Sequence, residues 1–111
     1  MPKLSIKESA VAPTHFPDRW SKDLIGTPDL PTTSGFNLGR ASYTATEFGT
    51  PQVHADQEAV YVISGIGEIK IGEEVIALEP GTAFYVAPGV PHCARRTGEV
   101  SVEVVYTHGA I

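Results

Sequence analysis

The sequence predicts an all-β fold of the sandwich or barrel type. From Phe36 onward, short segments rich in valine, isoleucine, tyrosine and threonine alternate with glycine or proline, which is typical of short strands joined by turns. The expected strands are 38–48, 58–64, 66–71, 74–78, 82–87, 91–96 and 100–107. The last alternates most clearly and places on one face Val100, Val102, Val104 and Tyr106. No segment after residue 36 has the length and period of a helix, so parallel strand–helix–strand units are excluded.

The chain has 111 residues, the size of one domain. We expect residues 36–111 to form the β-barrel and residues 1–35, rich in proline, to be an N-terminal arm of the same domain. Two structures fit the middle of this arm. Phe16, Trp20 and Leu24 could share one face of a helical turn that ends at Gly26. Alternatively, the arm is extended and its aromatic residues fill the edge of the core.

Composition excludes several classes of function. Net charge is −5, from 13 acidic and 8 basic residues, and no basic stripe is present, so we expect no nucleic-acid partner. The longest apolar runs, 59–63 and 83–87, are strand-sized, whereas a membrane helix needs about 20 residues. The N-terminus lacks an apolar run of signal-peptide length, and Cys93 has no second cysteine to pair with. We therefore expect a cytoplasmic protein with no membrane contact.

Most residues able to bind a metal lie in two segments framed by glycine and proline. Gln52 and His54 are two residues apart and share a face of an extended chain, which Glu58 joins if the chain stays extended. His92 arrives from a different strand, as barrels allow. Imidazole with carboxylate suits Fe, Mn, Ni, Zn or Co. The spacing thus indicates a candidate site for a divalent transition metal.

The framing residues resemble the two motifs of the cupin superfamily, Gly-x5-His-x-His-x(3,4)-Glu-x6-Gly and Gly-x5-Pro-x-Gly-x2-His-x3-Asn. The matching residues are His54, Glu58 and Gly65 in the first motif and Gly81, Gly89 and His92 in the second. The resemblance covers about residues 38–107 and implies a double-stranded β-helix, or jelly-roll barrel. It also implies a homodimer, since small cupins commonly pair, and a short chain has little apolar area of its own to bury.

The sequence also departs from the family pattern. The departures are Thr46 for the first glycine, Gln52 for the first histidine, Ala87 for the proline and Arg96 for the asparagine. The resemblance implies a metal bound by Gln52, His54, Glu58 and His92. A glutamine oxygen is a neutral and weaker ligand than imidazole for a transition metal.

A rival assignment combines His54, Asp56 and His92 as the two-histidine, one-carboxylate triad of oxygenases dependent on Fe(II) and 2-oxoglutarate. Those enzymes are normally much longer and place an arginine beyond the second histidine, but this chain has no lysine or arginine after Arg96. Otherwise Asp56 is a turn residue or a carboxylate that orients a ligand.

Two further residues are candidates for orienting a substrate. Arg96 shares the face of His92 on an extended strand and could clamp an anion, although a solvated side chain is the alternative. Tyr106 is the preferred pocket hydroxyl because its face otherwise carries only valines. His15 and His108 lie in the arm and the tail, and we expect both at the surface.

Two functional hypotheses follow from the resemblance. The first is a metal-dependent enzyme of the dioxygenase, isomerase or lyase type that acts on a small carbonyl- or carboxylate-bearing substrate. The second is a cupin that binds a small ligand without turnover and has a degenerate or empty metal site. The fold alone does not decide between them, because one fold hosts many functions.

Overall fold

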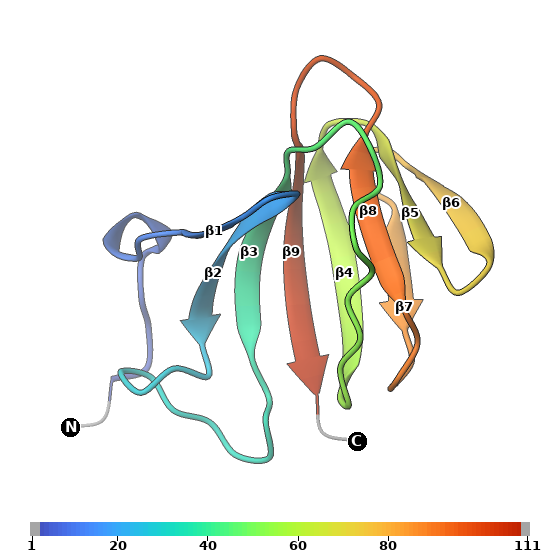
Figure 1. Ribbon diagram of the computed structural model, residues 1–111. Helices are drawn as coiled ribbons and strands as arrows, with labels where there is room; N and C mark the ends of the chain where they lie inside the picture. The colour runs from blue at the N-terminus through green and yellow to red at the C-terminus, as the bar shows by residue number, and fades with distance from the viewer. Residues whose placement is uncertain (1–2, 110–111) are drawn as a thin grey trace.

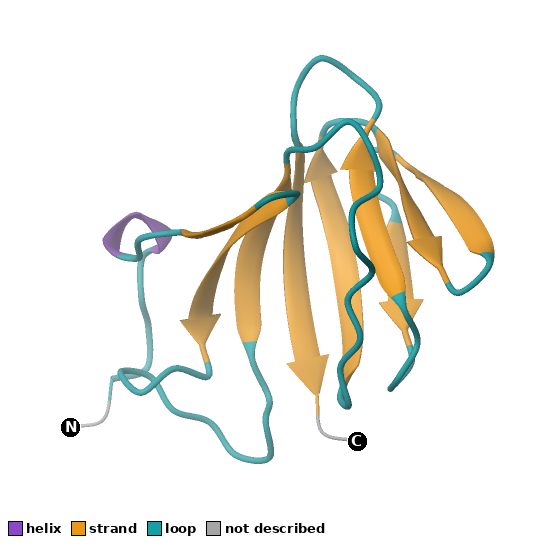
Figure 2. Cartoon of the chain, in the orientation of Figure 1, coloured by secondary structure: helices purple, strands orange, loops and turns teal. Residues whose placement is uncertain are grey.

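The computed structural model describes residues 3–109, which form two antiparallel sheets that face each other (Figure 1). The larger sheet has six strands in the order β1-β2-β3-β9-β4-β7, and the smaller has three in the order β6-β5-β8. The strands are β1 (Thr14–Phe16), β2 (Arg19–Ile25), β3 (Leu38–Tyr43), β4 (Gln57–Ser64), β5 (Gly67–Ile71), β6 (Glu74–Leu78), β7 (Ala83–Val86), β8 (His92–Arg96) and β9 (Val102–Gly109). One 3-10 turn, η1 (Glu8–Ala10), is the helical element of the described part (Figure 2).

The all-β prediction is confirmed, and every predicted segment after residue 36 contains one strand. The helical alternative for the arm is wrong, because β2 pairs with β3 and β1 folds back onto β2. Trp20 and Leu24 are four residues apart, so they share a face of a strand as they would share a face of a helix. Gly26 adopts φ +93 and begins a turn after β2. Within the described residues no helix is long and apolar enough to cross a membrane.

The core lies between the two sheets and is built from alternating inward positions. In β4, Val60 and Val62 are buried while Tyr61 and Ile63 are exposed. β9 alternates in the same way from Val102, its first residue, whereas Val100 lies before the strand and is exposed. The core residues are Ala41, Tyr43, Val60, Val62, Ile69, Leu78, Phe84, Val86, Ala94, Val102, Val104 and Tyr106. These side chains hold β4 and β9 against the smaller sheet.

Residues 44–56 connect β3 to β4 and run alongside β8 (Figure 1). The backbones of Gln52 and His92 exchange two hydrogen bonds of 2.8 and 3.0 Å, and Arg96 donates its amide to the carbonyl of Ala45. This connection therefore fixes the chain just before β4 against the start of β8. Both segments carry candidate metal ligands, so the backbone pairing places those ligands at one end of the barrel.

Gly39 allows the ring of Tyr106 to cross β3. The two residues are cross-strand partners, and a Cβ built on Gly39 would lie 2.2 Å from Cζ of Tyr106 and 2.6 Å from the carbonyl oxygen of Lys22. With no side chain at this position, the Tyr106 hydroxyl reaches β2 and donates a hydrogen bond of 2.5 Å to Asp23. Because Gly39 has no side chain, the hydrogen bond from Tyr106 to Asp23 can join β2 to the barrel interior.

We expect Gly39→Ala to destabilise the protein by about 1–3 kcal/mol, because the added methyl group overlaps a buried ring and backbone. Urea unfolding of both proteins measures the difference. Gly49→Ala is the matched control: its Cβ would meet Asp18 at an ordinary 3.7 Å, and we expect a change within about 0.5 kcal/mol. Equal stabilities of the two variants would contradict the close packing described.

Candidate metal centre

Three histidines and one glutamate converge at the end of the barrel where β4 and β8 begin. Glu58 on β4 lies directly opposite His108 on β9 in the antiparallel register, so both side chains point inward. His92 is the first residue of β8, on the facing sheet. His54 belongs to the connection that precedes β4 and is held there by its carbonyl, which accepts a hydrogen bond from the amide of Gly89. Four separate backbone segments therefore supply the cluster.

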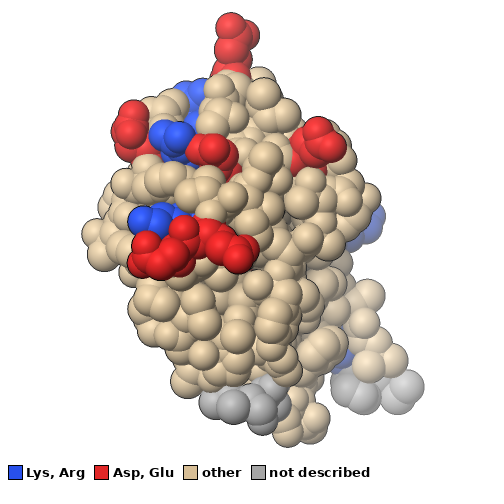
Figure 3. Space-filling model, turned by 90° about the vertical axis from the view of Figure 1, so that its right-hand side faces the viewer, with Lys and Arg blue, Asp and Glu red and all other residues tan. Residues whose placement is uncertain are grey.

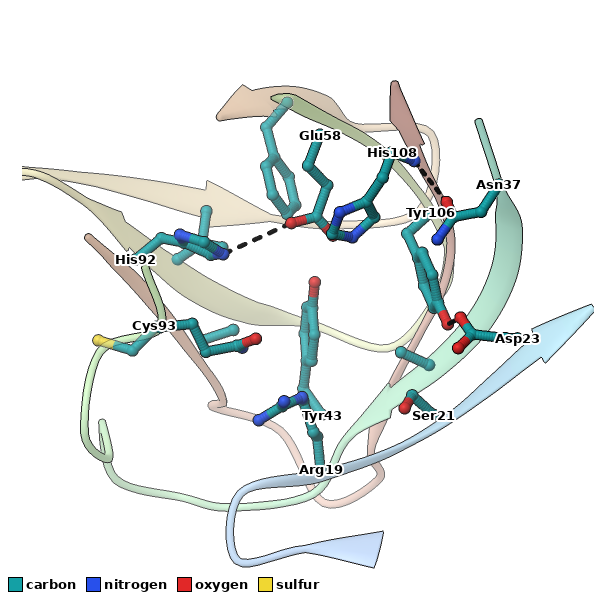
Figure 4. A pocket seen from close by; sticks show the side chains of 15 residues that line it. Arg19, Ser21, Asp23, Asn37, Tyr43, Glu58, His92, Cys93, Tyr106 and His108 are labelled. Carbon is teal, nitrogen blue, oxygen red and sulfur yellow. Dashed lines mark hydrogen bonds and ion pairs between the residues drawn. The ribbon is translucent and has the colours of Figure 1, made fainter. Parts of the chain in front are cut away.

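The donor atoms of the cluster lie at contact distance from one another. His54 Nε2 is 3.2 Å from Glu58 Oε1 and 3.3 Å from His92 Nε2. His92 Nε2 is 3.4 Å from Glu58 Oε1, and His108 Nε2 is 3.4 Å from Glu58 Oε2. Ligand atoms of His54, Glu58 and His108 all lie within 4.8 Å of one another. Glu58 is thus the centre around which the three imidazoles gather. Figure 4 shows two of them, His92 and His108, on either side of its carboxylate.

The outer nitrogens of all three rings face oxygen atoms. His54 Nδ1 lies 3.0 Å from the carbonyl oxygen of Asp56 and 2.8 Å from its Oδ1, and His108 Nδ1 lies 3.1 Å from Oδ2 of the same residue. His92 Nδ1 lies 3.0 Å from the carbonyl oxygen of Val90. Because a backbone carbonyl only accepts, Nδ1 of His54 and His92 carries the proton. This tautomer leaves the Nε2 lone pairs directed at the centre of the cluster.

These residues fit a divalent transition metal. Two donor atoms at about 2.1 Å from one ion lie about 3.0–3.4 Å apart at octahedral or tetrahedral angles. The separations from His54 Nε2 and His92 Nε2 to each other and to Glu58 Oε1 fall in that range, at 3.2 to 3.4 Å. Hydrogen bonding of the second ring nitrogen to carboxylate or carbonyl oxygen is the usual support for a metal-binding histidine. Each of the three histidines has that support.

The pKa shifts in the cluster favour a negative carboxylate at Glu58 and positive imidazoles at His92 and His108. Burial favours the neutral form of Glu58, but hydrogen bonds from His108 and His92 outweigh it and lower the pKa of this carboxyl to about 2. Burial lowers the pKa of His92, but its hydrogen bonds to Glu58 and Val90 raise the pKa overall. The hydrogen bond to Glu58 likewise raises the pKa of His108 against the effect of burial. Without a metal, Glu58 therefore favours the charged forms of His92 and His108.

A cavity of about 250 Å³ extends from the cluster into the barrel. Its lining is Arg19, Ser21, Asp23, Asn37, Ala41, Tyr43, Gln52, Glu58, Ile69, Phe84, His92, Cys93, Ala94, Tyr106 and His108. Burial raises the pKa of Tyr43, and burial with the hydrogen bond to Asp23 raises that of Tyr106, so both phenols stay protonated. On the side that Figure 3 shows, the lower end of the molecule carries few lysine, arginine, aspartate or glutamate side chains.

The structure brings together most of the predicted site residues. His54, Glu58 and His92 meet in the cluster, and Gln52 lines the cavity beside His92, with which its backbone pairs. Tyr106 also lines the cavity, and its ring packs edge-on against His108 with 5.6 Å between centroids.

Arg96 is not among the cavity-lining residues. Its guanidinium donates to the carbonyl oxygens of Thr44 at 3.0 Å and Gly98 at 2.7 Å, so it ties the end of β8 to two connecting segments. Those two acceptors draw the side chain away from the cavity and towards the opposite end of the barrel from His92. In this structure the Arg96 side chain therefore binds backbone carbonyls of the connecting segments.

The expectation that His108 lies at the surface is wrong, whereas His15 is exposed as predicted. His108 continues the inward alternation of Val104 and Tyr106 on β9. The same two-residue period was visible in the sequence and, extended by one step, would have placed His108 inside. The predicted strand ends at residue 107 and therefore leaves this histidine in a tail.

Asp56 touches the rings from outside. Its carboxylate lies on the Nδ1 atoms of His54 and His108, away from the Nε2 atoms that converge. This position suits a carboxylate that orients two ligands. In the oxygenase-type triad of His54, Asp56 and His92, the Asp56 carboxylate would instead converge with the Nε2 atoms.

The fold and the cluster define a small two-sheet β-barrel with a histidine–glutamate site inside one end. Residues 41–108 match the cupin domain family, and the chain belongs to that family. It is 29% identical over 102 residues to the tetracenomycin polyketide synthase protein TcmJ of Streptomyces glaucescens, covering 91% of this chain and 68% of that protein.

Solved structures share the fold. An RmlC-like cupin from Shewanella frigidimarina superposes with a TM-score of 0.77 at 14% identity, over 98% of this chain and 92% of that one. The polyketide cyclase RemF from Streptomyces resistomycificus gives 0.79 at 16% identity, over 98% and 80%. A variant of the oxalate decarboxylase OxdC from Bacillus subtilis gives 0.81 at 15% identity, over 99% of this chain and 30% of that larger one.

We expect the cluster to stabilise the metal-free protein most strongly between about pH 4.5 and pH 6.5. The pKa of Glu58 falls from 4.5 to about 2 on folding, so its contribution is present above pH 4.5 and is lost as pH falls. The pKa values of His92 and His108 rise above 6.5, so their contribution is present below pH 6.5 and is lost as pH rises.

Urea unfolding with a chelator present, at about pH 3, pH 5.5 and pH 8.5, measures this profile for the wild type and Glu58→Gln. The stability difference between them is expected to be largest at the middle value. Glu99→Gln, in the exposed connection before β9, is the control. A difference that stays constant across the three conditions would contradict the charge pairing.

Proposed function

We propose that the chain binds one divalent transition metal through His54, Glu58, His92 and His108 and acts as a metal-dependent enzyme on a small carbonyl- or carboxylate-bearing substrate in the cavity. The observation that carries the proposal is the convergence of three Nε2 atoms and one carboxylate at the spacing of ligands around a single ion. His108 supplies the imidazole that Gln52 does not, and Gln52 remains a neutral neighbour of the site.

The chemistry of the donor set supports this class of substrate. Three neutral imidazoles and one carboxylate leave a net positive centre around a divalent ion, which favours an oxygen anion. The names of the proteins compared above point the same way: a polyketide synthase protein, a polyketide cyclase and an oxalate decarboxylase. We infer an enolisable carbonyl compound as the preferred substrate.

The chain's own residues bind and orient this substrate. A divalent ion in the cluster would supply Lewis-acid stabilisation of a substrate oxygen. Asp56 holds His54 and His108 in the tautomer that directs Nε2 inward. Tyr106, held by Asp23, presents its phenol to the same cavity from β9, the strand that also carries His108.

Elemental analysis of protein purified without added metal tests the proposal. We expect Fe, Mn, Ni, Zn or Co at near one equivalent, and its loss in His54→Ala and His92→Ala because each removes a ligand. His15→Ala removes an exposed imidazole from β1 and is the matched control, with metal content unchanged.

A metal-free wild type whose melting temperature does not respond to divalent ions would contradict the proposal. That result would favour the alternative, a cupin that binds a small ligand without turnover. With metal present, oxygen consumption and α-proton exchange over a panel of carbonyl and carboxylate compounds distinguish dioxygenase from isomerase or lyase chemistry.

His108→Ala is expected to weaken metal binding more than Gln52→Ala. The histidine contributes an imidazole aimed at Glu58, whereas the glutamine contributes at most a neutral oxygen. Competition with a chromophoric chelator measures both affinities. A larger loss for Gln52→Ala would instead support the ligand set that the family motif implies, with glutamine in place of the first histidine.

Asp56→Ala is expected to lower metal affinity about 10- to 100-fold, the usual effect of removing a carboxylate that holds ligating histidines. The same chelator competition measures it, and folding is checked by circular dichroism. Asp29→Ala removes an exposed carboxylate that pairs with Lys3 and serves as control. Unchanged affinity in Asp56→Ala would show that the histidines are oriented by the backbone alone.

A further inference from the structure

Tyr43 is a largely buried residue whose hydroxyl faces the cavity and points at the candidate metal-binding cluster. The residue is 8% exposed and its ring belongs to the core. Figure 4 shows the hydroxyl pointing across the cavity towards Glu58 and His108. Within residues 3–109 no protein group forms a hydrogen bond with it. The hydroxyl is open to the cavity, since the described residues include no buried side-chain donor without a partner, and a molecule in the cavity can reach it.

The other tyrosine that lines the cavity, Tyr106, and the lining arginine Arg19 are already hydrogen-bonded. Tyr106 donates to Asp23, and Arg19 donates to Asp18 at 2.8 Å. Tyr85, on the outer face of the same large sheet, donates to Gln57 at 2.8 Å. Tyr43 is therefore the phenol that the fold leaves available to a molecule in the cavity.

We propose that Tyr43 binds the substrate by donating a hydrogen bond to one of its oxygen atoms. The inference rests on the proposed function, because it places that oxygen between the hydroxyl and the histidine cluster. A phenol is a directional donor to oxygen, and a substrate with two oxygens close together can meet both Tyr43 and the cluster. The substrate class is thus narrowed to enolisable compounds with two neighbouring oxygen functions, such as 1,3-dicarbonyls.

The position of Tyr43 in the fold supports a binding role. It is paired with Arg19 on β2 and Val102 on β9, so strands on both sides fix its backbone. Its ring packs in the core, which orients the hydroxyl without any hydrogen bond to the protein. For packing alone, phenylalanine would serve as well.

Tyr43→Phe separates these possibilities. With protein loaded with the metal that it carries on purification, we expect 2,4-pentanedione to bind about 3- to 10-fold more weakly to the variant, the loss of one neutral hydrogen bond. Isothermal titration measures binding of the probe, and chelator competition measures binding of the metal. Metal affinity is expected to be unchanged, and the melting temperature is expected not to fall because no protein hydrogen bond is lost. Tyr85→Phe is the matched control and should leave probe affinity unchanged.

Equal probe affinity in Tyr43→Phe and the wild type would overturn the inference and leave the metal site standing. Failure of the metal-loaded wild type to bind 2,4-pentanedione would overturn it as well. Failure of the wild type to bind any divalent metal would overturn the proposed function together with the inference.

A second measurement does not depend on the variant. In the wild type labelled with ¹³C at tyrosine Cζ, the Tyr43 resonance should shift on addition of the probe while the Tyr85 resonance stays in place. A stationary Tyr43 resonance at saturating probe would overturn the inference.

Discussion

The antiparallel pairing of β4 with β9 is the interaction on which the rest of the site depends. It sets Glu58 opposite His108, Val60 opposite Tyr106 and Val62 opposite Val104. Because the side-chain period of a strand is two, a slip by one residue would turn all of these residues outward. The buried valines make such a slip costly, since they would lose contact with the core. Apolar packing therefore fixes the register that brings a carboxylate and an imidazole face to face.

The N-terminal arm forms part of the cavity wall. β2 extends the larger sheet past β3, and Arg19, Ser21 and Asp23 on alternate positions line the cavity. Gly39 allows Tyr106 to reach Asp23 across β3, so the arm is joined to the same strand that carries His108. A change in β2 would thus alter the cavity wall without touching any proposed metal ligand.

The sequence predicted the parts of this protein that depend on local pattern. Alternating valines and the glycine or proline turns gave the strands, and short spacings grouped His54 with Glu58. The contact between Glu58 and His108 joins residues 50 positions apart and depends on strand register, which a single sequence does not specify. The four-residue spacing of Trp20 and Leu24 fits a helix and a strand equally, and only the pairing with β3 decides between them. The direction of Arg96 depends on the carbonyls of Thr44 and Gly98, which lie in irregular connections.

Gln52 and His108 together explain how the site can keep three imidazoles while departing from the family motif. The motif takes two histidines from one strand, whereas here the third ring comes from β9 and shares Asp56 with His54. One carboxylate that serves two rings links the ends of β9 and of the connection before β4, so the two ligands are positioned jointly. Gln52 beside them is neutral. It therefore adds no charge to the donor set of three imidazoles and one carboxylate. The relocation would therefore keep the charge of the donor set around a divalent ion, and Tyr43 faces this donor set across the cavity.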